Sequence, residues 1–369
     1  MTDVFQAIGI IAIYWASVLA VSYFLKGKVK GLQINPLMII YKKEAAFKRL
    51  EHLAGRKWVR AALLLGVVLT FVSVFLFYYT IFGVVSSRFA SSQSSEGLVP
   101  IIPGITITGV TIIYVLFSLG ISAAVHELSH AVASKALGVP IKSVGFIVSL
   151  FIPAAFVEPD EESFNSASRL KKIQILSAGP ASNLILGFSF LFILSSVAVT
   201  MPGALITSVD QGYPAQQSGL SPGLVIIAIN GTTISTPTDL SPFIARYSNS
   251  SVTFNLTIYD PKTNMTYWKD VYKPANFSRI GVTLEQARGP SPLPDSIYFP
   301  VVNILFYLYL INVSLAIINA APIFITDGGK IINEIIAWKL KGNAGKVVNF
   351  FIQVFTLLLI LSSITFTPI

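Results

Sequence analysis

The chain has 369 residues, of which 53% are hydrophobic and 12% are charged, and its mean hydropathy is +0.71. A soluble domain carries about 25% charged residues, so this composition excludes an ordinary soluble globular protein and indicates a protein embedded in a bilayer. The absence of cysteine excludes disulfides, thiolate metal ligands and a cysteine nucleophile, so any metal must be held by His, Asp or Glu.

Six stretches are long and apolar enough to cross a membrane, since a helix of about 20 apolar residues spans the hydrocarbon core. The first has no basic n-region and no small-residue cleavage site, which favours a retained helix over a signal peptide. The stretches are 5–25, 62–84, 105–125, 173–199, 297–320 and 347–366. The sequence therefore predicts an α-helical polytopic membrane protein with about six transmembrane helices.

The net charge of +9 is concentrated in three segments between these stretches. Nineteen of the 26 Lys and Arg residues lie in 26–60, 135–172 and 328–346. If the spans alternate sides, all three segments share one face, and the positive-inside rule makes that face cytoplasmic. This distribution favours membrane topology and contact with anionic lipid over nucleic-acid binding. The polar segment 203–290 is then extracytoplasmic.

Residues 126–130 read His-Glu-Leu-Ser-His. His126 and His130, four residues apart on a helix, lie on one side of it and can reach a single ion. Glu127 is rotated away from that line, so it suits a general base acting on water rather than a metal ligand. The motif ends an apolar run that begins near Ile105, and ionisable residues inside a membrane usually mark a functional site. The alternative, two structural histidines, requires a polar partner for each ring in an apolar helix.

The motif provides two ligands, and a catalytic zinc site has three protein ligands with the fourth tetrahedral position open for water. A third ligand, an Asp or Glu, is therefore expected near the cytoplasmic end of another span. Asp327 is the only carboxylate between Asp295 and Glu334, and we predict that it is this ligand. Glu158 is the competing candidate. A second interpretation makes Asp327 only the N-cap of a helix over 328–341.

Together with two further motifs, this pattern resembles the site-2 protease family. The family has His-Glu-x-x-His on one transmembrane helix, and Asn-x-x-Pro followed by Asp-Gly on a later one. Here the later element reads Asn319-Ala-Ala-Pro322, followed by Asp327-Gly328, with Thr326 and Ile325 departing from the family pattern. A Gly-Pro-x-x-Asn element at 179–183 also matches, and the resemblance covers roughly 105–366.

The resemblance implies an intramembrane zinc metalloprotease that acts on membrane proteins with a transmembrane helix. It implies that Asn319 helps bind the scissile peptide or its oxyanion. Asn183 is a second substrate-binding candidate, with helix packing as the alternative for both residues.

Residues 139–160 alternate short apolar runs with glycine and proline, which is poor as a helix and better as a membrane-dipping β-hairpin. The family has such a hairpin after its metal helix, where it is thought to pair with unwound substrate. Addition of a peptide to an edge strand is a general way to hold an extended chain.

The segment 203–290 is β-rich, with Pro and Gly at 214, 219, 222 and 223 and a hairpin turn at Asn230-Gly231. It looks like the PDZ domains that some site-2 proteases carry, which implies a peptide ligand or a size filter; a rigid plug is the alternative. Its five Asn-x-Ser/Thr sequons agree with an outside face. The expected organisation is two N-terminal spans with a basic loop (1–100), the first half of the core (101–200), the PDZ-like insert (203–290) and the second half of the core (291–369).

The alternative function is a non-catalytic transporter or scaffold that uses the same residues as a cation site. A carrier does not need a base such as Glu127 beside two histidines, and transporters usually show inverted repeats, which this sequence does not. We therefore expect a zinc protease in a prokaryotic cell membrane, with its active site towards the cytoplasm.

Overall fold

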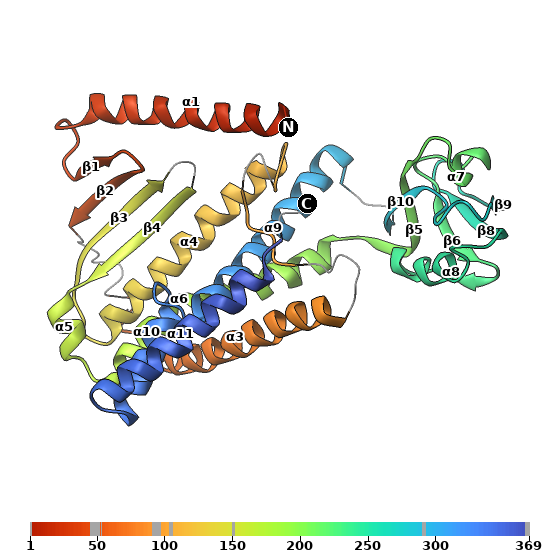
Figure 1. Ribbon diagram of the computed structural model, residues 1–369. Coiled ribbons are helices and arrows are strands. Elements are labelled where there is room, and N and C mark those ends of the chain that lie inside the picture. Colours follow the sequence, from red (N-terminus) through yellow and green to blue (C-terminus); the bar gives the residue numbers. More distant parts are fainter. Residues whose placement is uncertain are drawn as a thin grey trace. The chain divides into compact units, whose positions relative to one another are not determined.

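The computed structural model describes residues 2–44, 52, 54–90, 97–102, 106–149, 152–289 and 293–365. The chain divides into two compact units, Met1–Leu194 with Val301–Ile369, and Ser195–Pro300 (Figure 1). The first unit is mainly helical and the second is mainly β-structure.

Five helices among the described residues are long and apolar enough to cross a membrane. They are α3 (Lys57–Ala90), α4 (Thr111–Ala136), α6 (Arg169–Val197), α9 (Asp295–Ala320) and α11 (Asn343–Ser363). The first predicted span coincides with a further apolar helix, α1 (Thr2–Leu25). The protein is thus a multi-pass membrane protein, and each of the six predicted spans falls on a helix.

One predicted boundary is wrong in a way that matters for the site. We expected a span over 105–125 that ends at the His-Glu-x-x-His motif, whereas α4 begins at Thr111 and continues to Ala136. Gly109, with φ of 60°, turns the chain just before the helix, and Gly138, with φ of 80°, ends it. Both histidines therefore lie inside a continuous helix, which fixes their spacing.

The helix α3 is joined to the rest of the bundle by hydrogen bonds. Thr70 Oγ1 donates to the Ser177 carbonyl of α6 over 3.1 Å, and Tyr78 OH lies 2.8 Å from Thr356 Oγ1 of α11. At the end of α3, Arg88 donates to the carbonyl of Ser363. Because lipid offers no competing polar partner, such bonds hold transmembrane helices together.

The predicted hairpin is present, with β3 (Ile141–Ser149) and β4 (Ile152–Pro159) paired antiparallel. The interpretation of 26–60 as a loop is wrong in part, because it contains β1 (Leu32–Asn35) and β2 (Met38–Glu44). The strand β2 pairs with β3, which gives a four-stranded sheet in the order β1-β2-β3-β4. The outer strand β4 lies alongside α4 (Figure 1).

Ion pairs join the three basic segments. Lys42 of β2 pairs with Glu158 of β4. Lys172, at the start of α6, lies 3.4 Å from Glu334 of α10 (Asp327–Lys339), which follows α9. Each pair places residues of two different basic segments in direct contact, as required if all three lie on one side of the membrane.

The second unit is built on a six-stranded sheet of order β10-β5-β6-β8-β9, with β7 beside β6. The strands are β5 (Thr200–Val209), β6 (Val225–Ile229), β7 (Thr232–Thr233), β8 (Val252–Asp260), β9 (Met265–Lys273) and β10 (Val282–Arg288), with short helices α7 (Pro214–Gln217) and α8 (Ser241–Arg246). The predicted turn is confirmed, because Asn230 and Gly231 join β6 to β7 with φ of 49° and 79°. A core of fully buried aliphatic side chains and Phe254 lies within this unit.

Lys273 of β9 is completely buried in this unit, and its three ammonium N–H groups are surrounded by four backbone carbonyls, those of Ser248, Ser250, Pro274 and Phe277. Lys273→Met keeps the apolar stem but leaves these carbonyls without their donor. We expect a loss of about 2–4 kcal/mol in the free energy of unfolding of this unit. The measurement is the urea dependence of proteolysis within 195–300, in the full chain in detergent micelles.

Lys269→Met is the matched control, because Lys269 lies on the same strand and makes one exposed hydrogen bond, to Gly219. Its effect should stay below about 0.5 kcal/mol. Equal urea midpoints for the two variants would contradict the role of Lys273.

Candidate metal centre

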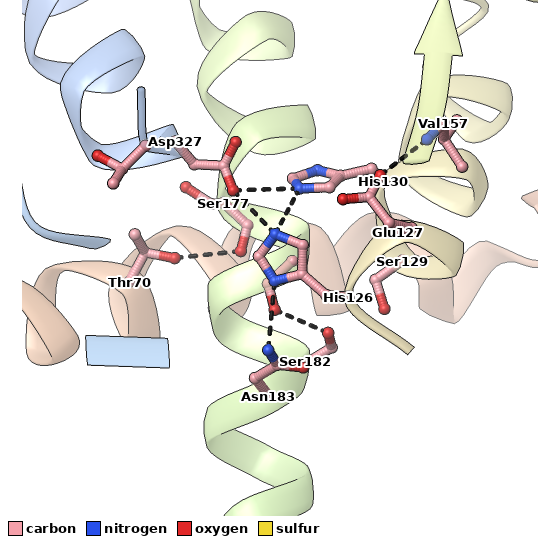
Figure 2. A network of polar contacts seen from close by, with 12 residues as sticks. Thr70, His126, Glu127, Ser129, His130, Val157, Ser177, Ser182, Asn183 and Asp327 are labelled. Carbon is pink, nitrogen blue, oxygen red and sulfur yellow. Dashed lines mark hydrogen bonds and ion pairs between the residues drawn. The ribbon is translucent and has the colours of Figure 1, made fainter. Parts of the chain in front are cut away.

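Three buried side chains from two helices converge in the membrane unit (Figure 2). His126 and His130 come from α4, and Asp327 is the first residue of α10. Asp327 Oδ2 lies 3.1 Å from Nε2 of His126 and 3.2 Å from Nε2 of His130, and the two ring nitrogens are 3.1 Å apart. The three residues predicted as metal ligands are thus brought together.

These distances fit zinc. Ligand atoms about 2.0–2.1 Å from a tetrahedral ion are separated from one another by about 3.3 Å, close to the observed triangle. Space for the ion is kept by Gly179 of α6, since a Cβ there would lie 2.5 Å from Nε2 of both histidines. Two imidazoles and one carboxylate are the protein donor set of a catalytic zinc site, in which the fourth position belongs to water or substrate.

The position of Asp327 depends on the turn that precedes it. Thr326, not Asp327, is the N-cap of α10, and its hydroxyl oxygen accepts from Gly329 N over 3.2 Å. Gly328 and Gly329 allow the chain to approach the end of α9, because a Cβ at either would overlap the carbonyl of Ala320 or Ile323. The carboxylate of Asp327 is therefore free of capping and points to the histidines.

A backbone carbonyl orients the ring of His130. The carbonyl oxygen of Ile175 lies 2.7 Å from Nδ1 of His130, and since a carbonyl can only accept, Nδ1 carries the proton. This leaves the lone pair of Nε2 for a metal, as in most zinc-binding histidines. Pro180, inside α6, lacks the N–H that would continue the helical ladder, and nearby carbonyls of α6 accept from side chains of other helices.

Asn183 lies against the Nδ1 atom of His126. Its amide nitrogen Nδ2 is 3.3 Å from Nδ1, and the residue is fully buried. The amide rotamer that turns Oδ1 to the ring satisfies both the ring N–H and an oxygen that otherwise has no partner. The structure thus places this predicted substrate-binding residue against a metal ligand.

Glu127 lines a cavity of about 610 Å³ together with His130 and Asp327. Its Oε2 accepts a hydrogen bond of 2.8 Å from the backbone N–H of Val157 on β4. Figure 2 shows Glu127 on the β4 side of the histidines. No side-chain motif signals this backbone donor, which the sequence interpretation missed.

The two remaining candidates lie elsewhere. Glu158 pairs with Lys42 rather than with the histidines, and hydrogen bonds from Lys42 and Ser143 hold the pKa of its carboxyl below the ordinary value. Asn319 is half-buried in the last turn of α9, and it is not among the side chains that converge on the three ligands.

A model of peptidase family M50 matches residues 114–362, more than half of the chain. The chain belongs to peptidase family M50. The match includes α6, α9 and α10 and most of α4 and α11, and therefore both histidines and Asp327. The resemblance to site-2 proteases is confirmed, and zinc is the cofactor that the family and the donor set both indicate.

Three relatives illustrate the similarity. An uncharacterised protein of Methanocaldococcus jannaschii is 31% identical over 232 residues, which cover 63% of this chain and 56% of that protein. Zinc metalloprotease RasP of Shouchella clausii is 24% identical over 238 residues, covering 52% of this chain and 56% of RasP. A membrane-bound transcription factor site-2 protease homologue of Arabidopsis thaliana is 28% identical over 134 residues, covering 35% and 26%. The chain spans 56% or less of the length of these three relatives.

Gly179 provides a test of the metal site that does not depend on catalysis. Gly179→Ala places a methyl group where the ion would lie, so the zinc dissociation constant should rise by about tenfold or more. Bound zinc is measured by elemental analysis after dialysis against a graded series of zinc buffers. Gly120→Ala on α4 is the control, because a Cβ there meets nothing within 4 Å. Unchanged zinc affinity in Gly179→Ala would rule out this position for the ion.

Proposed function

We propose that the protein is an intramembrane zinc endopeptidase that hydrolyses peptide bonds within transmembrane segments of membrane proteins. The observation that carries the proposal is the convergence of His126, His130 and Asp327, with Glu127 beside them, on helices of an apolar bundle. The site-2 protease homology of the M50 family supports the same class of substrate.

In this proposal His126, His130 and Asp327 hold the zinc, and Glu127 is the catalytic residue. Zinc, when bound, acts as a Lewis acid that activates a water molecule and polarises the scissile carbonyl. The Glu127 carboxylate accepts a proton from the attacking water and delivers it to the amine nitrogen as the C–N bond breaks. Asn183 and the Ile175 carbonyl keep the two imidazoles in the required tautomer, so we assign Asn183 a positioning role.

Substrate binding is proposed at the outer edge of β4. An unwound segment of the substrate helix adds to this edge as a strand, and the adjacent cavity leads to Glu127 and Asp327. Asn319 is retained as a donor to the scissile peptide or its oxyanion, on the family resemblance.

We place the basic segments on the cytoplasmic side of a prokaryotic cell membrane, where they contact anionic lipid. The ion pairs Lys42–Glu158 and Lys172–Glu334 support a shared side for these segments. The metal centre then lies towards the cytoplasm and the insert 203–290 lies outside.

For this insert we propose a PDZ-like fold between the two halves of the protease core, 101–200 and 291–369. The arrangement of short helices around a sheet with β10 at one edge supports the assignment. An edge strand is where a PDZ domain adds a peptide, so a peptide or C-terminus from a membrane protein is the proposed ligand.

Glu127→Gln tests the mechanism. The variant keeps all three ligands and the size of the side chain but removes the proton acceptor, so cleavage should fall by about a hundredfold or more at unchanged zinc content. The assay uses the purified full chain in nanodiscs with a panel of single-span peptides, with and without a zinc chelator. Asp327→Asn should differ, losing both zinc and activity.

Zinc bound in wild type, with no cleavage of any peptide and no effect of Glu127→Gln, would favour a non-catalytic cation site. Full activity of Glu127→Gln at normal zinc content would exclude the mechanism, even if wild type is a protease.

The topology is tested by single cysteines, since the chain has none of its own. Cysteines at Lys142 and Lys341 should react with a membrane-impermeant thiol reagent only from the cytoplasmic side. A cysteine at Asn264, at an exposed position of the insert, should react only from outside. Labelling of all three from the same side would overturn the proposed arrangement.

A further inference from the structure

The four-stranded sheet offers one open edge beside the metal centre. The strand β3 is covered on its other side by β2 over the register Ile39–Val148 to Glu44–Ser143. In the described part of the sheet, β1 and β4 are therefore the outer strands. Of these two outer strands, β4 is the one that packs along α4. The cavity that contains Glu127 is lined by β4 residues Phe156 to Pro159.

The direction of each backbone N–H on β4 follows from the ladder. In an antiparallel strand, the N–H and C=O of one residue point to the same side, and successive residues alternate. Val157 N donates to Glu127 of α4, away from β3. Asp160 N donates to the Pro140 carbonyl, on the β3 side. Residues 153, 155, 157 and 159 therefore face the open edge, and 154, 156 and 158 face β3.

Two of the four outward residues are prolines, Pro153 and Pro159. Proline is tolerated at these positions because a missing N–H does not interrupt the ladder with β3. The donors that the edge presents between the two prolines are consequently those of Ala155 and Val157. A substrate carbonyl placed opposite Pro153 or Pro159 finds no donor, which is costly beside a buried site.

One of the two donors is already occupied. Glu127 Oε2 takes the position on Val157 N that the carbonyl of an added strand would take. A carboxylate and a substrate carbonyl cannot both accept this N–H in line with the strand, so an incoming strand displaces Glu127. The released carboxylate stays in the cavity that contains His130 and Asp327.

We propose that Pro153 and Pro159 fix the register of the bound peptide on Ala155 and Val157, and that Glu127 masks Val157 until a peptide strand replaces it. Strand binding and release of the general base are then one event, so the base is freed when an extended chain is aligned at the metal. This inference rests on the proposed function for the identity of the peptide, but the masking contact concerns the resting protein alone.

The register is tested with Pro159→Ala, which adds a third outward donor beyond Val157 without changing the ladder to β3. The shifted register then pairs with residues 157 and 159, so Glu127 is displaced in it as well. A peptide can then move by two residues, about 6.8 Å along the strand, and still pair with two donors. The probe is a synthetic single-span Leu/Ala peptide with a central Gly-Ser-Gly, incubated with the full-length protein in nanodiscs. Mass spectrometry should show one cleavage site in wild type and, in Pro159→Ala, an additional site two residues away.

Pro36→Ala is the matched control, since Pro36 lies in the turn between β1 and β2 of the same sheet, away from the β4 edge. Its products should equal those of wild type. A single, unshifted site in Pro159→Ala with normal zinc content would overturn the role of the prolines. Retention of the original site in Pro159→Ala also shows that the variant is folded.

The masking is tested by hydrogen exchange without any peptide. Glu127→Leu removes the acceptor, so exchange of the Val157 amide should accelerate at least about tenfold, while the Ala155 amide is unchanged. Equal Val157 exchange in wild type and Glu127→Leu would overturn the masking.

A failure of the proposed function can be recognised separately. If wild type cleaves no peptide, or if Pro159→Ala does not fold, exchange in wild type with and without the peptide tests strand binding at this edge. Slower exchange at Ala155 on peptide addition then supports strand binding at this edge, whereas unchanged exchange at Ala155 contradicts it.

Discussion

Two imidazoles and one carboxylate lie within 3.2 Å of one another among apolar helices, and the rest of the membrane unit serves this arrangement. Ionisable groups are costly in such surroundings unless they are paired or bind a metal. Three different elements are needed to satisfy them, with α4 providing the rings, α10 the carboxylate, and α6 the Ile175 carbonyl and Asn183 amide that contact the Nδ1 atoms of the rings. The packing of α4, α6 and α10 is therefore determined by the polar contacts of the two histidines and Asp327.

Close backbone approach makes that geometry possible. Gly179 leaves the volume of an ion between α4 and α6, while Gly328 and Gly329 let the start of α10 fold back against the end of α9. Thr326 takes over the capping of α10, so the neighbouring carboxylate does not have to. The departure of Thr326 from the family pattern thus preserves the ligand geometry.

The metal ligands could be predicted from sequence because zinc chemistry restricts both residue type and spacing. Asp327 was identifiable since few carboxylates exist in the membrane region, although sequence could not separate a ligand from a helix cap. The strand β1 was missed because it has only four residues, and β2 was missed because its short apolar run leads directly into Lys42, Lys43 and Glu44, which gives a weak strand signal. The hydrogen bond from Val157 to Glu127 had no side-chain signature at all, since its donor is a backbone N–H.

The same edge strand illustrates why sheet edges near a buried site need special treatment. Exposed backbone donors invite pairing with any extended chain, and they are unfavourable where water is scarce. In the β3–β4 hairpin, β2 covers the free side of β3, two prolines remove donors from the free side of β4, and Glu127 occupies a third position there. What remains open is a short stretch around Ala155, beside the residue that holds the general base. The same few residues therefore give the β4 edge two properties: it resists pairing with arbitrary extended chains, and it selects one alignment of the bound peptide.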